Sequence, residues 1–210
     1  MIQMAEDGNN HLPNFTNAAF DIVAIAASAG GLTALTKVLS TLPTEFTAAI
    51  AIVQHLGPQH RSFMAEILTR HTSLVVKQAE EGDYLTPGTA YIAPPNRHLL
   101  VNGDGTLSLS QSELVHFLRP SADLLFESVA ATYKNRAIAL VLTGTGSDGA
   151  MGIEAIKKMG GTVIVQDVET AEFSGMPSAA IQTGNVDFIL PLDEISSTLV
   201  TLVMGNFEIN

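Results

Sequence analysis

The sequence predicts an α/β fold: a doubly wound, mostly parallel β-sheet with helices on both faces and an antiparallel hairpin insertion. Two observations support this prediction. Short apolar runs without alternation recur along the chain, as in parallel strands that are covered on both sides. Stretches of helical periodicity separate these runs and give a β-α-β-α order.

The first predicted strand meets the first helix at a serine that two glycines follow closely. Residues 22–26 form the apolar run, and leucine or valine then recurs at helical spacing over residues 32–42. Pro43 ends this helix. Residues 48–53 form a second apolar strand, and an amphipathic helix over residues 63–68 comes after the next loop.

Residues 74–118 change character and predict an antiparallel insertion or a sheet edge rather than a separate domain. Short β-rich runs alternate with turns throughout this stretch. The strongest hairpin signal pairs residues 99–101 with residues 107–109 across Asn102-Gly-Asp-Gly105.

The last third of the chain returns to alternating helices and strands. Pro120 begins a predicted helix that reaches Tyr133, and residues 137–142 form a third buried strand. The elements predicted after it are a glycine-rich turn over 143–149, a helix to Met159, a strand over 161–166, a loop over 167–176, a helix over 177–183, a strand over 186–190 and a terminal helix capped by Asp193.

Composition and charge narrow the class of protein. The 210 residues are 46% hydrophobic, which is enough for a sizeable core, and we expect a flexible tail over residues 1–18 and one domain over residues 19–205. A net charge of −11 argues against a nucleic-acid surface or an anionic membrane surface. The chain has no cysteine, which excludes disulfides and thiolate metal sites and leaves the redox compartment unrecorded. With no signal-peptide core and no apolar run near the roughly 18 residues that span a bilayer, we expect a cytoplasmic protein.

Three predicted strands end in polar residues. Ser28 follows the first strand, His55 follows the second, and Asp148 lies in the turn after the third. Because parallel strands share one carboxyl edge, these side chains can converge there. They fit a hydrolytic triad in which the histidine takes the serine proton and the aspartate orients the imidazole. The turn after Ser28 could supply part of an oxyanion site.

Each of the three residues also has a plainer interpretation. Ser28 could simply cap the helix after it, and Asp148 could simply cap the helix that follows its turn. His55 is one of six histidines, and a loop histidine is often exposed or bonded to the backbone. Their placement at three strand ends of one sheet favours the triad.

The turn Gly144-Thr-Gly-Ser-Asp-Gly149 suits a second class of protein, because it reads G-x-G-x-x-G between a strand and a helix. Asp167 follows about 20 residues later, where a ribose-binding acid would lie in a dinucleotide-binding protein. The motif comes late, however, rather than opening a two-half Rossmann sheet. It also places Asp148 where a pyrophosphate would sit, at a cost in charge repulsion.

A metal site has little support in the sequence. His55 and His60 are five residues apart with a proline between them, and His98 is isolated. No HExxH motif or carboxylate-rich loop occurs. We therefore expect neither a metal nor an organic cofactor.

Six motifs in order resemble the catalytic domain of the chemotaxis protein-glutamate methylesterases, over roughly residues 20–200. The motifs are Ile25–Gly31, Val53–His55, Tyr91–His98, Leu118–Asp123, Leu142–Gly149 and Gly175–Pro177. The resemblance implies a doubly wound α/β enzyme that hydrolyses γ-glutamyl methyl esters on the cytoplasmic helices of chemoreceptors, and often deamidates receptor glutamines as well. It implies no cofactor and a methylated receptor as the protein substrate.

The resemblance also assigns roles to residues. Ser28 would be the nucleophile, His55 the general base and Asp148 its orienting partner. Ala29 stands where the family often has threonine, and Thr145 where it usually has the methionine whose backbone N–H faces the oxyanion; both positions belong to the implied oxyanion and substrate contacts. Residues near His55 could line an open cleft: Leu56, Phe63 and Met64, the last two better suited to the core.

Control of the activity is a separate expectation. Family members commonly have an N-terminal receiver domain, and residues 1–20 are too short for one. The chain would then be a stand-alone enzyme or a fragment; a stand-alone enzyme would be constitutively active or controlled by a separate receiver domain. A non-catalytic signalling module is the third alternative.

Overall fold

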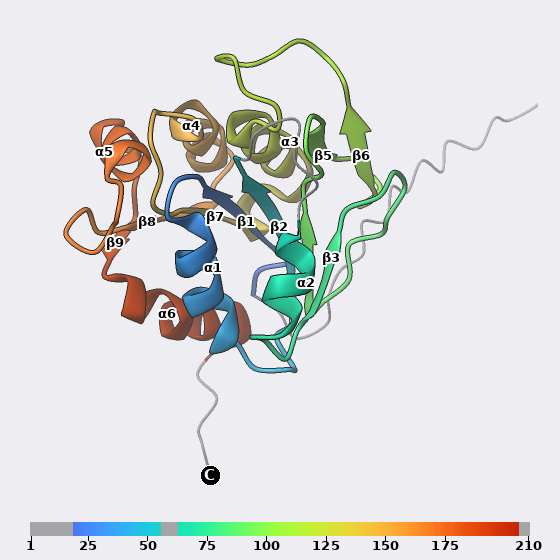
Figure 1. Cartoon of the computed structure of the whole chain (residues 1–210), viewed down its shortest axis with the longest axis horizontal. Helices are drawn as coiled ribbons and strands as arrows, with labels where there is room; N and C mark the ends of the chain where they lie inside the picture. Colours follow the sequence, from blue (N-terminus) through green and yellow to red (C-terminus); the bar gives the residue numbers. More distant parts are fainter. Residues whose placement is uncertain (1–18, 56–62, 206–210) are drawn as a thin grey trace, which may run out of the picture.

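The computed structural model describes residues 19–55 and 63–205. The tail predicted over residues 1–18 lies outside this part of the chain, as do Leu56 and His60. The described elements form a seven-stranded parallel sheet with helices on both faces and a separate antiparallel hairpin (Figure 1). The predicted fold class is confirmed.

The strands of the large sheet lie in the order β3-β4-β2-β1-β7-β8-β9. They are β1 (Ile22–Ala27), β2 (Ala49–Gln54), β3 (Val75–Gln78), β4 (Thr89–Ile92), β7 (Ala137–Val141), β8 (Thr162–Gln166) and β9 (Phe188–Leu190). The hairpin pairs β5 (His98–Val101) with β6 (Leu107–Ser110). The strand order reverses direction between β1 and β7, and such a switch point opens a crevice at the carboxyl ends of the strands.

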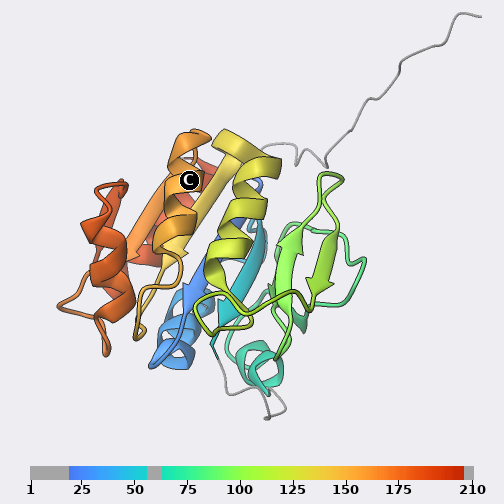
Figure 2. The same ribbon diagram turned by 90° about the horizontal axis from the view of Figure 1, so that it is seen from above.

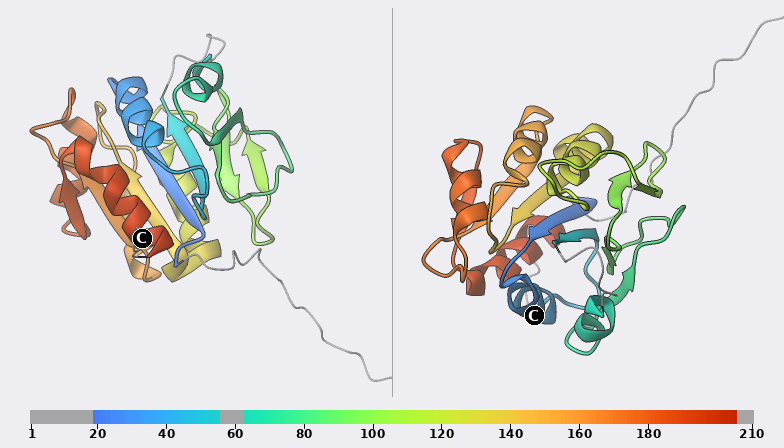
Figure 3. Two further views of the ribbon diagram at one scale, coloured as in Figure 1. Left: turned by 90° about the horizontal axis from the view of Figure 1, so that it is seen from below. Right: turned by 45° about the horizontal axis from the view of Figure 1, so that its top comes forward.

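Helices cover the two faces of the sheet in separate layers (Figures 2 and 3). One layer contains α1 (Gly31–Ser40), α2 (Met64–Thr69) and α6 (Leu192–Met204). The opposite layer contains α3 (Ala122–Tyr133), α4 (Ala150–Lys158), α5 (Gly175–Gln182) and the hairpin. A 3-10 turn, Lys134–Arg136, leads into β7. No helix in the described ranges is long and apolar enough to cross a membrane.

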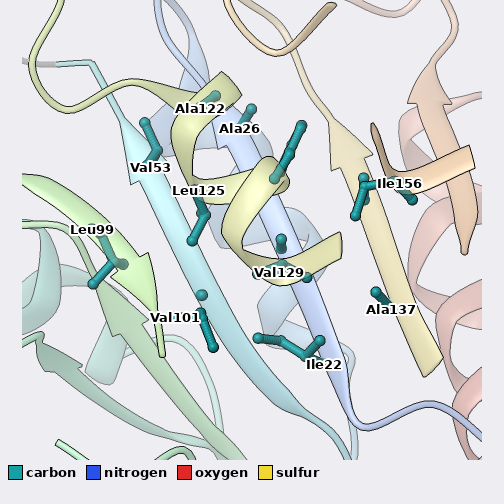
Figure 4. Packing of buried hydrophobic residues seen from close by; sticks show 14 of the residues in the cluster. Ile22, Ala26, Val53, Leu99, Val101, Ala122, Leu125, Val129, Ala137 and Ile156 are labelled. Atoms are coloured by element: carbon teal, nitrogen blue, oxygen red, sulfur yellow. The ribbon is translucent and has the colours of Figure 1, made fainter. Parts of the chain in front are cut away.

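Burial on both faces explains why the first strand shows no alternation of polar and apolar residues. Every residue of β1 is fully buried. Ile22 and Ala26 belong to the core beneath α3 and α4, whereas Val23 and Ile25 belong to the core beneath α1 and α6. Figure 4 shows the first of these cores, in which side chains of α3 lie over β1 and β2.

The stretch over residues 74–118 is only partly an antiparallel insertion. The predicted hairpin is confirmed, with Val101 opposite Leu107. β3 and β4 are instead parallel strands of the main sheet, with β3 at its edge. The segment that contains α2 connects β2 to β3, and residues 79–88 connect β3 to β4, so that all three strands run in the same direction. Short apolar runs do not show the direction of a strand.

Some helix boundaries also differ from prediction. α3 begins at Ala122 rather than Pro120, which follows a cis peptide bond, and α5 begins two residues before Pro177. Asp193 does not cap the terminal helix, because Pro191 is its N-cap residue. Asp193 lies in the first turn and forms an exposed ion pair with Lys37 at 3.2 Å.

Helices α3 and α4 approach closely at Gly152. A Cβ atom added there would lie 2.6 Å from Phe126 Cβ and 3.0 Å from Asp123 Cα. The absence of a side chain at this position therefore sets how near the N-terminal ends of the two helices can come.

We expect Gly152→Ala to lower the free energy of unfolding by about 1–2 kcal/mol. Overpacking of this kind costs roughly 1–3 kcal/mol, which outweighs the better helix propensity of alanine. The measurement is the urea unfolding midpoint at constant m value. Met151→Ala is the control, since Met151 is 59% exposed on the same helix. An unchanged midpoint for Gly152→Ala would contradict the tight packing of α3 on α4.

Candidate active site

Ser28 lies directly after β1, at the switch point of the sheet. Its backbone N–H donates to Thr143 O at 3.0 Å, and its carbonyl accepts from Gln54 Nε2 at 2.7 Å. The N-cap residue of α1 is Gly30, with φ of +75° and no side-chain cap bond, so Ser28 does not cap the helix. Among the described residues no group bonds the Ser28 hydroxyl.

His55 lies beside Ser28 because of the register between β1 and β2. Ala27 pairs with Gln54, so the next residue of each strand shares the same edge. The His55 ring places Nε2 2.7 Å from Asp148 Oδ2, and the side chain is only 10% exposed. The exposed or backbone-bonded interpretation of His55 is therefore wrong.

Asp148 is buried and accepts four hydrogen bonds. Besides His55, the donors are the Ser121 hydroxyl at 2.9 Å and the backbone N–H groups of Ala122 at 2.6 Å and Asp123 at 3.1 Å. Burial alone would raise the pKa of Asp148, but these bonds and the charge of the imidazole outweigh it and lower the pKa to about 2. Asp148 therefore remains a hydrogen-bond acceptor at neutral pH. The plainer interpretation, in which Asp148 caps α4, is wrong, because the N-cap residue of α4 is Gly149.

The contact between His55 and Asp148 also assigns the tautomer of the ring. An ionised carboxylate can only accept, so the proton of neutral His55 belongs on Nε2. Nδ1 then carries the lone pair, and no described residue bonds it. The arrangement leaves Nδ1 as the ring atom that could take a proton, and His55 and Ser28 follow paired residues of neighbouring strands, although no hydrogen bond joins their side chains.

Asp123 is a second buried carboxylate that the sequence analysis did not single out. Its Oδ1 accepts the backbone N–H groups of Gly149 at 2.9 Å and Gly152 at 2.8 Å, both at the N-terminus of α4. Burial is the main cause that raises the pKa of Asp123 to about 6, and the nearby charge of Asp148 adds to it. Two signals for it were present in the sequence: an acidic residue in the first turn of a predicted helix, and its place at the end of the family motif Leu118–Asp123.

This contact also bears on the dinucleotide alternative. The N-terminus of α4, where a pyrophosphate would bind, already donates to Asp123. Asp167 accepts the N–H of Glu169 at 3.0 Å in a local turn. A phosphate at the turn over residues 144–149 would meet buried carboxylates, so the geometry argues against this class of ligand.

The backbone N–H groups of Ala29 and Thr145 have no protein acceptor in the described part of the chain. Both belong to turns next to Ser28. Gly144 N donates to Phe173 O at 2.9 Å, which fixes the second turn, and a Cβ at Gly144 would lie 2.8 Å from Ser28 Cβ. The N–H of Ala29 is near the serine because Ala29 is the next residue, and the close approach that Gly144 permits brings the turn that carries the N–H of Thr145 near it as well.

His98 is completely buried and contacts Ser121, the residue whose hydroxyl donates to Asp148. Its Nδ1 accepts the backbone N–H of Ser121 at 3.2 Å, and its Nε2 donates to Glu113 O at 3.1 Å. Burial is the main cause that lowers the pKa of His98. Both nitrogens are engaged, and no three His, Asp or Glu residues of the described chain are grouped to hold a metal ion.

Two residues expected near His55 behave differently from each other. Met64 is 5% exposed and packs in the core beneath α1, as expected. Phe63 is 56% exposed, so its expected role in the core is wrong.

Comparison with known proteins now identifies the family. Residues 23–199 match the family described as CheB methylesterase. The chain belongs to the CheB methylesterase family. A relative from Leptospira interrogans is 42% identical over 189 residues, which cover 90% of this chain and 98% of the relative.

Two further members show how this chain relates to longer proteins and to a solved structure. A protein of Pyrococcus horikoshii, named protein-glutamate methylesterase/protein-glutamine glutaminase, is 41% identical over 86% of this chain and 50% of its own length. The Thermotoga maritima CheB methylesterase catalytic domain is 38% identical, with a TM-score of 0.85, over 88% of this chain and 99% of that one. The fold of this CheB-family chain is thus that of a catalytic domain.

The lowered pKa of Asp148 predicts a stability contribution that depends on pH. The contribution is complete above the unfolded pKa of about 4 and is lost as the pH falls toward about 2, because only the ionised carboxylate makes these bonds. We expect wild type to exceed Asp148→Asn by about 2 kcal/mol in free energy of unfolding near pH 4.5, and the gap to narrow toward pH 2. Urea unfolding across this range measures it; a constant gap would contradict the ionised, hydrogen-bonded state.

Proposed function

We propose that this chain hydrolyses γ-glutamyl methyl esters on the cytoplasmic helices of methylated chemoreceptors, and deamidates receptor glutamines at the same site, with residues 19–205 acting as one catalytic domain. The observation that supports this best is the 2.7 Å contact between His55 and Asp148 beside Ser28, in a chain of the CheB methylesterase family. Relatives named for both activities are about 40% identical to this chain.

In the proposed mechanism Ser28 is the nucleophile. Its Oγ attacks the ester carbonyl carbon while His55 Nδ1 takes the hydroxyl proton, and Asp148 stabilises the imidazolium through Nε2–H. Collapse of the tetrahedral intermediate breaks the bond to methoxide, which leaves as methanol with the proton from His55. A water molecule then hydrolyses the acyl-enzyme by the same proton path and regenerates Ser28. With a glutamine side chain the leaving group is ammonia.

We assign the oxyanion contacts to the backbone N–H groups of Ala29 and Thr145. Both lack a protein acceptor among the described residues, as a preorganised oxyanion site requires. One such donor contributes roughly 3–4 kcal/mol of transition-state stabilisation, by analogy with subtilisin. The Thr145 side chain is exposed, so the assigned role depends on its backbone rather than on its hydroxyl.

We expect Ser28→Ala to abolish methanol release from methylated chemoreceptor, because no other group would form the acyl-enzyme. The measurement is methanol released per enzyme, with thermal unfolding to show that the variant is folded. Ser174→Ala is the matched control, since Ser174 is an exposed serine that makes no side-chain cap bond. Turnover that survives Ser28→Ala would overturn the mechanism. A folded wild type without turnover would favour a non-catalytic signalling module.

Substitutions at Thr145 distinguish a catalytic contribution of its backbone N–H from one of its side chain. Thr145→Ala and Thr145→Met keep the N–H group, so we expect kcat to stay within about threefold of wild type in both. Loss of a backbone oxyanion donor would instead cost roughly 10²–10³ in kcat. Single-turnover rates on the methylated receptor provide the measurement. A large loss in Thr145→Ala that Thr145→Met restores would show that the side chain at this position acts in catalysis.

A further inference from the structure

The loop between β6 and α3 presents an exposed apolar turn next to the candidate active site. We call residues Leu114–Leu118 the Phe117 lip. Phe117 is 92% exposed and Leu114 is 52% exposed. A pocket of about 260 Å³ lies between this lip and the imidazole of the site. Its lining residues are His55, Asn96, Leu114, Phe117, Leu118, Arg119 and Pro120.

The backbone of the lip adopts a conformation that side chains disfavour. His116 and Phe117 have φ of +49° and +64°, in the left-handed region, although neither is glycine. Two hydrogen bonds between Val115 and Leu118, at 3.1 and 2.8 Å, close the turn around them. Strained, exposed apolar residues of this kind cluster at sites that bind ligands.

Arg119, the residue after the Phe117 lip, forms hydrogen bonds that hold the two ends of this loop together. Its guanidinium donates to Asn96 Oδ1 at 2.8 and 3.0 Å, and to the carbonyl oxygens of Gln111 at 3.1 Å and Ser112 at 2.7 Å. The cation is therefore occupied by the protein and leaves the apolar side chains as the binding surface of the lip. Leu114, Phe117 and Leu118 give the pocket an apolar wall that suits an apolar group.

The lip is also tied to the proposed triad. Glu113, just before it, accepts from His98, which in turn accepts from the backbone of Ser121. The hydroxyl of Ser121 donates to Asp148. The same buried connections that hold Asp148 thus fix the position of the lip relative to His55.

We propose that the Phe117 lip is a substrate subsite that receives an apolar side chain of the receptor helix, one turn from the esterified glutamate. The inference rests on the proposed function and specifies how its substrate is recognised. Residues three or four apart share one face of a helix, so an ester held at Ser28 and His55 brings such a neighbour toward the pocket. The net charge of −11 disfavours an anionic membrane as the occupant.

The test compares a helical receptor peptide bearing a γ-methyl glutamate with N-acetyl-glutamate γ-methyl ester amide, which has no helix. Phe117→Asn removes the apolar surface and tolerates positive φ, and Phe117→Leu retains apolar character. We expect Phe117→Asn to lose roughly tenfold in kcat/KM on the peptide, mainly through KM, and less than twofold on the small ester. Phe117→Leu should recover most of the loss. Phe188→Ala, an apolar change on β9 at the far edge of the sheet, should alter neither.

A binding measurement keeps this inference separate from the catalytic proposal. In a Ser28→Ala background, fluorescence anisotropy should show roughly tenfold weaker binding of the helical peptide when Phe117→Asn is added, whether or not wild type turns over. Equal losses on the peptide and the small ester, or no loss in binding, would overturn the subsite. A wild-type dimer that Phe117→Asn dissociates in sedimentation would overturn it too, since the lip would then join two copies.

A peptide series locates the partner of the lip. Each apolar residue within four positions of the ester is replaced in turn by serine. We expect one position, three or four residues from the esterified glutamate, at which the replacement weakens peptide binding to the Ser28→Ala enzyme. The same replacement should not weaken binding to the enzyme that carries both Ser28→Ala and Phe117→Asn. Additive effects at every position would contradict the subsite.

Discussion

Two buried carboxylates that cap each other's helices hold this structure together at its candidate site. Asp148, just before α4, accepts two N–H groups at the start of α3, and Asp123, in the first turn of α3, accepts two at the start of α4. Each carboxylate therefore sits at the positive end of the other's helix, which offsets part of the cost of burying two like charges. The exchange requires the helices to approach closely, as Gly152 permits.

The different hydrogen bonds of the two carboxylates also explain why the pKa of Asp148 is lowered and that of Asp123 is raised. Asp148 accepts further bonds from Ser121 and His55, so its ionised form is strongly favoured. Asp123 has fewer donors and faces the charge of its neighbour, which raises its pKa. The carboxylate that touches His55 thus stays charged at neutral pH. Its fixed charge sets the tautomer of the imidazole without any change of conformation.

The sequence predicts that Ser28, His55 and Asp148 share one edge of the sheet, because Ser28 and His55 directly follow β1 and β2 and Asp148 lies in the turn between β7 and α4. The carboxyl edge of a parallel sheet gathers such residues whatever their separation along the chain. Asp123 could not be found in this way, since its role depends on the distance between two helices that sequence periodicity does not report. The Phe117 lip was equally hidden, because left-handed φ values at non-glycine residues have no sequence signature. The parallel direction of β3 was missed for a similar reason, because pairing depends on a crossover rather than on composition.

A glycine-rich turn before a helix is a general anion site, which is why the turn over residues 144–149 also fits a dinucleotide-binding protein. In this chain the N–H groups at the start of α4 are taken by Asp123 from within the protein. The glycines then serve a different purpose: Gly144 lets the turn pack against Ser28, and the turn aims Asp148 at His55. An internal carboxylate thus occupies the helix end where a phosphate would bind, and the turn holds Asp148 against the imidazole of His55. The same G-x-G-x-x-G sequence can therefore bind a phosphate or position an aspartate, depending on whether the fold brings a second carboxylate to the N-terminus of the helix.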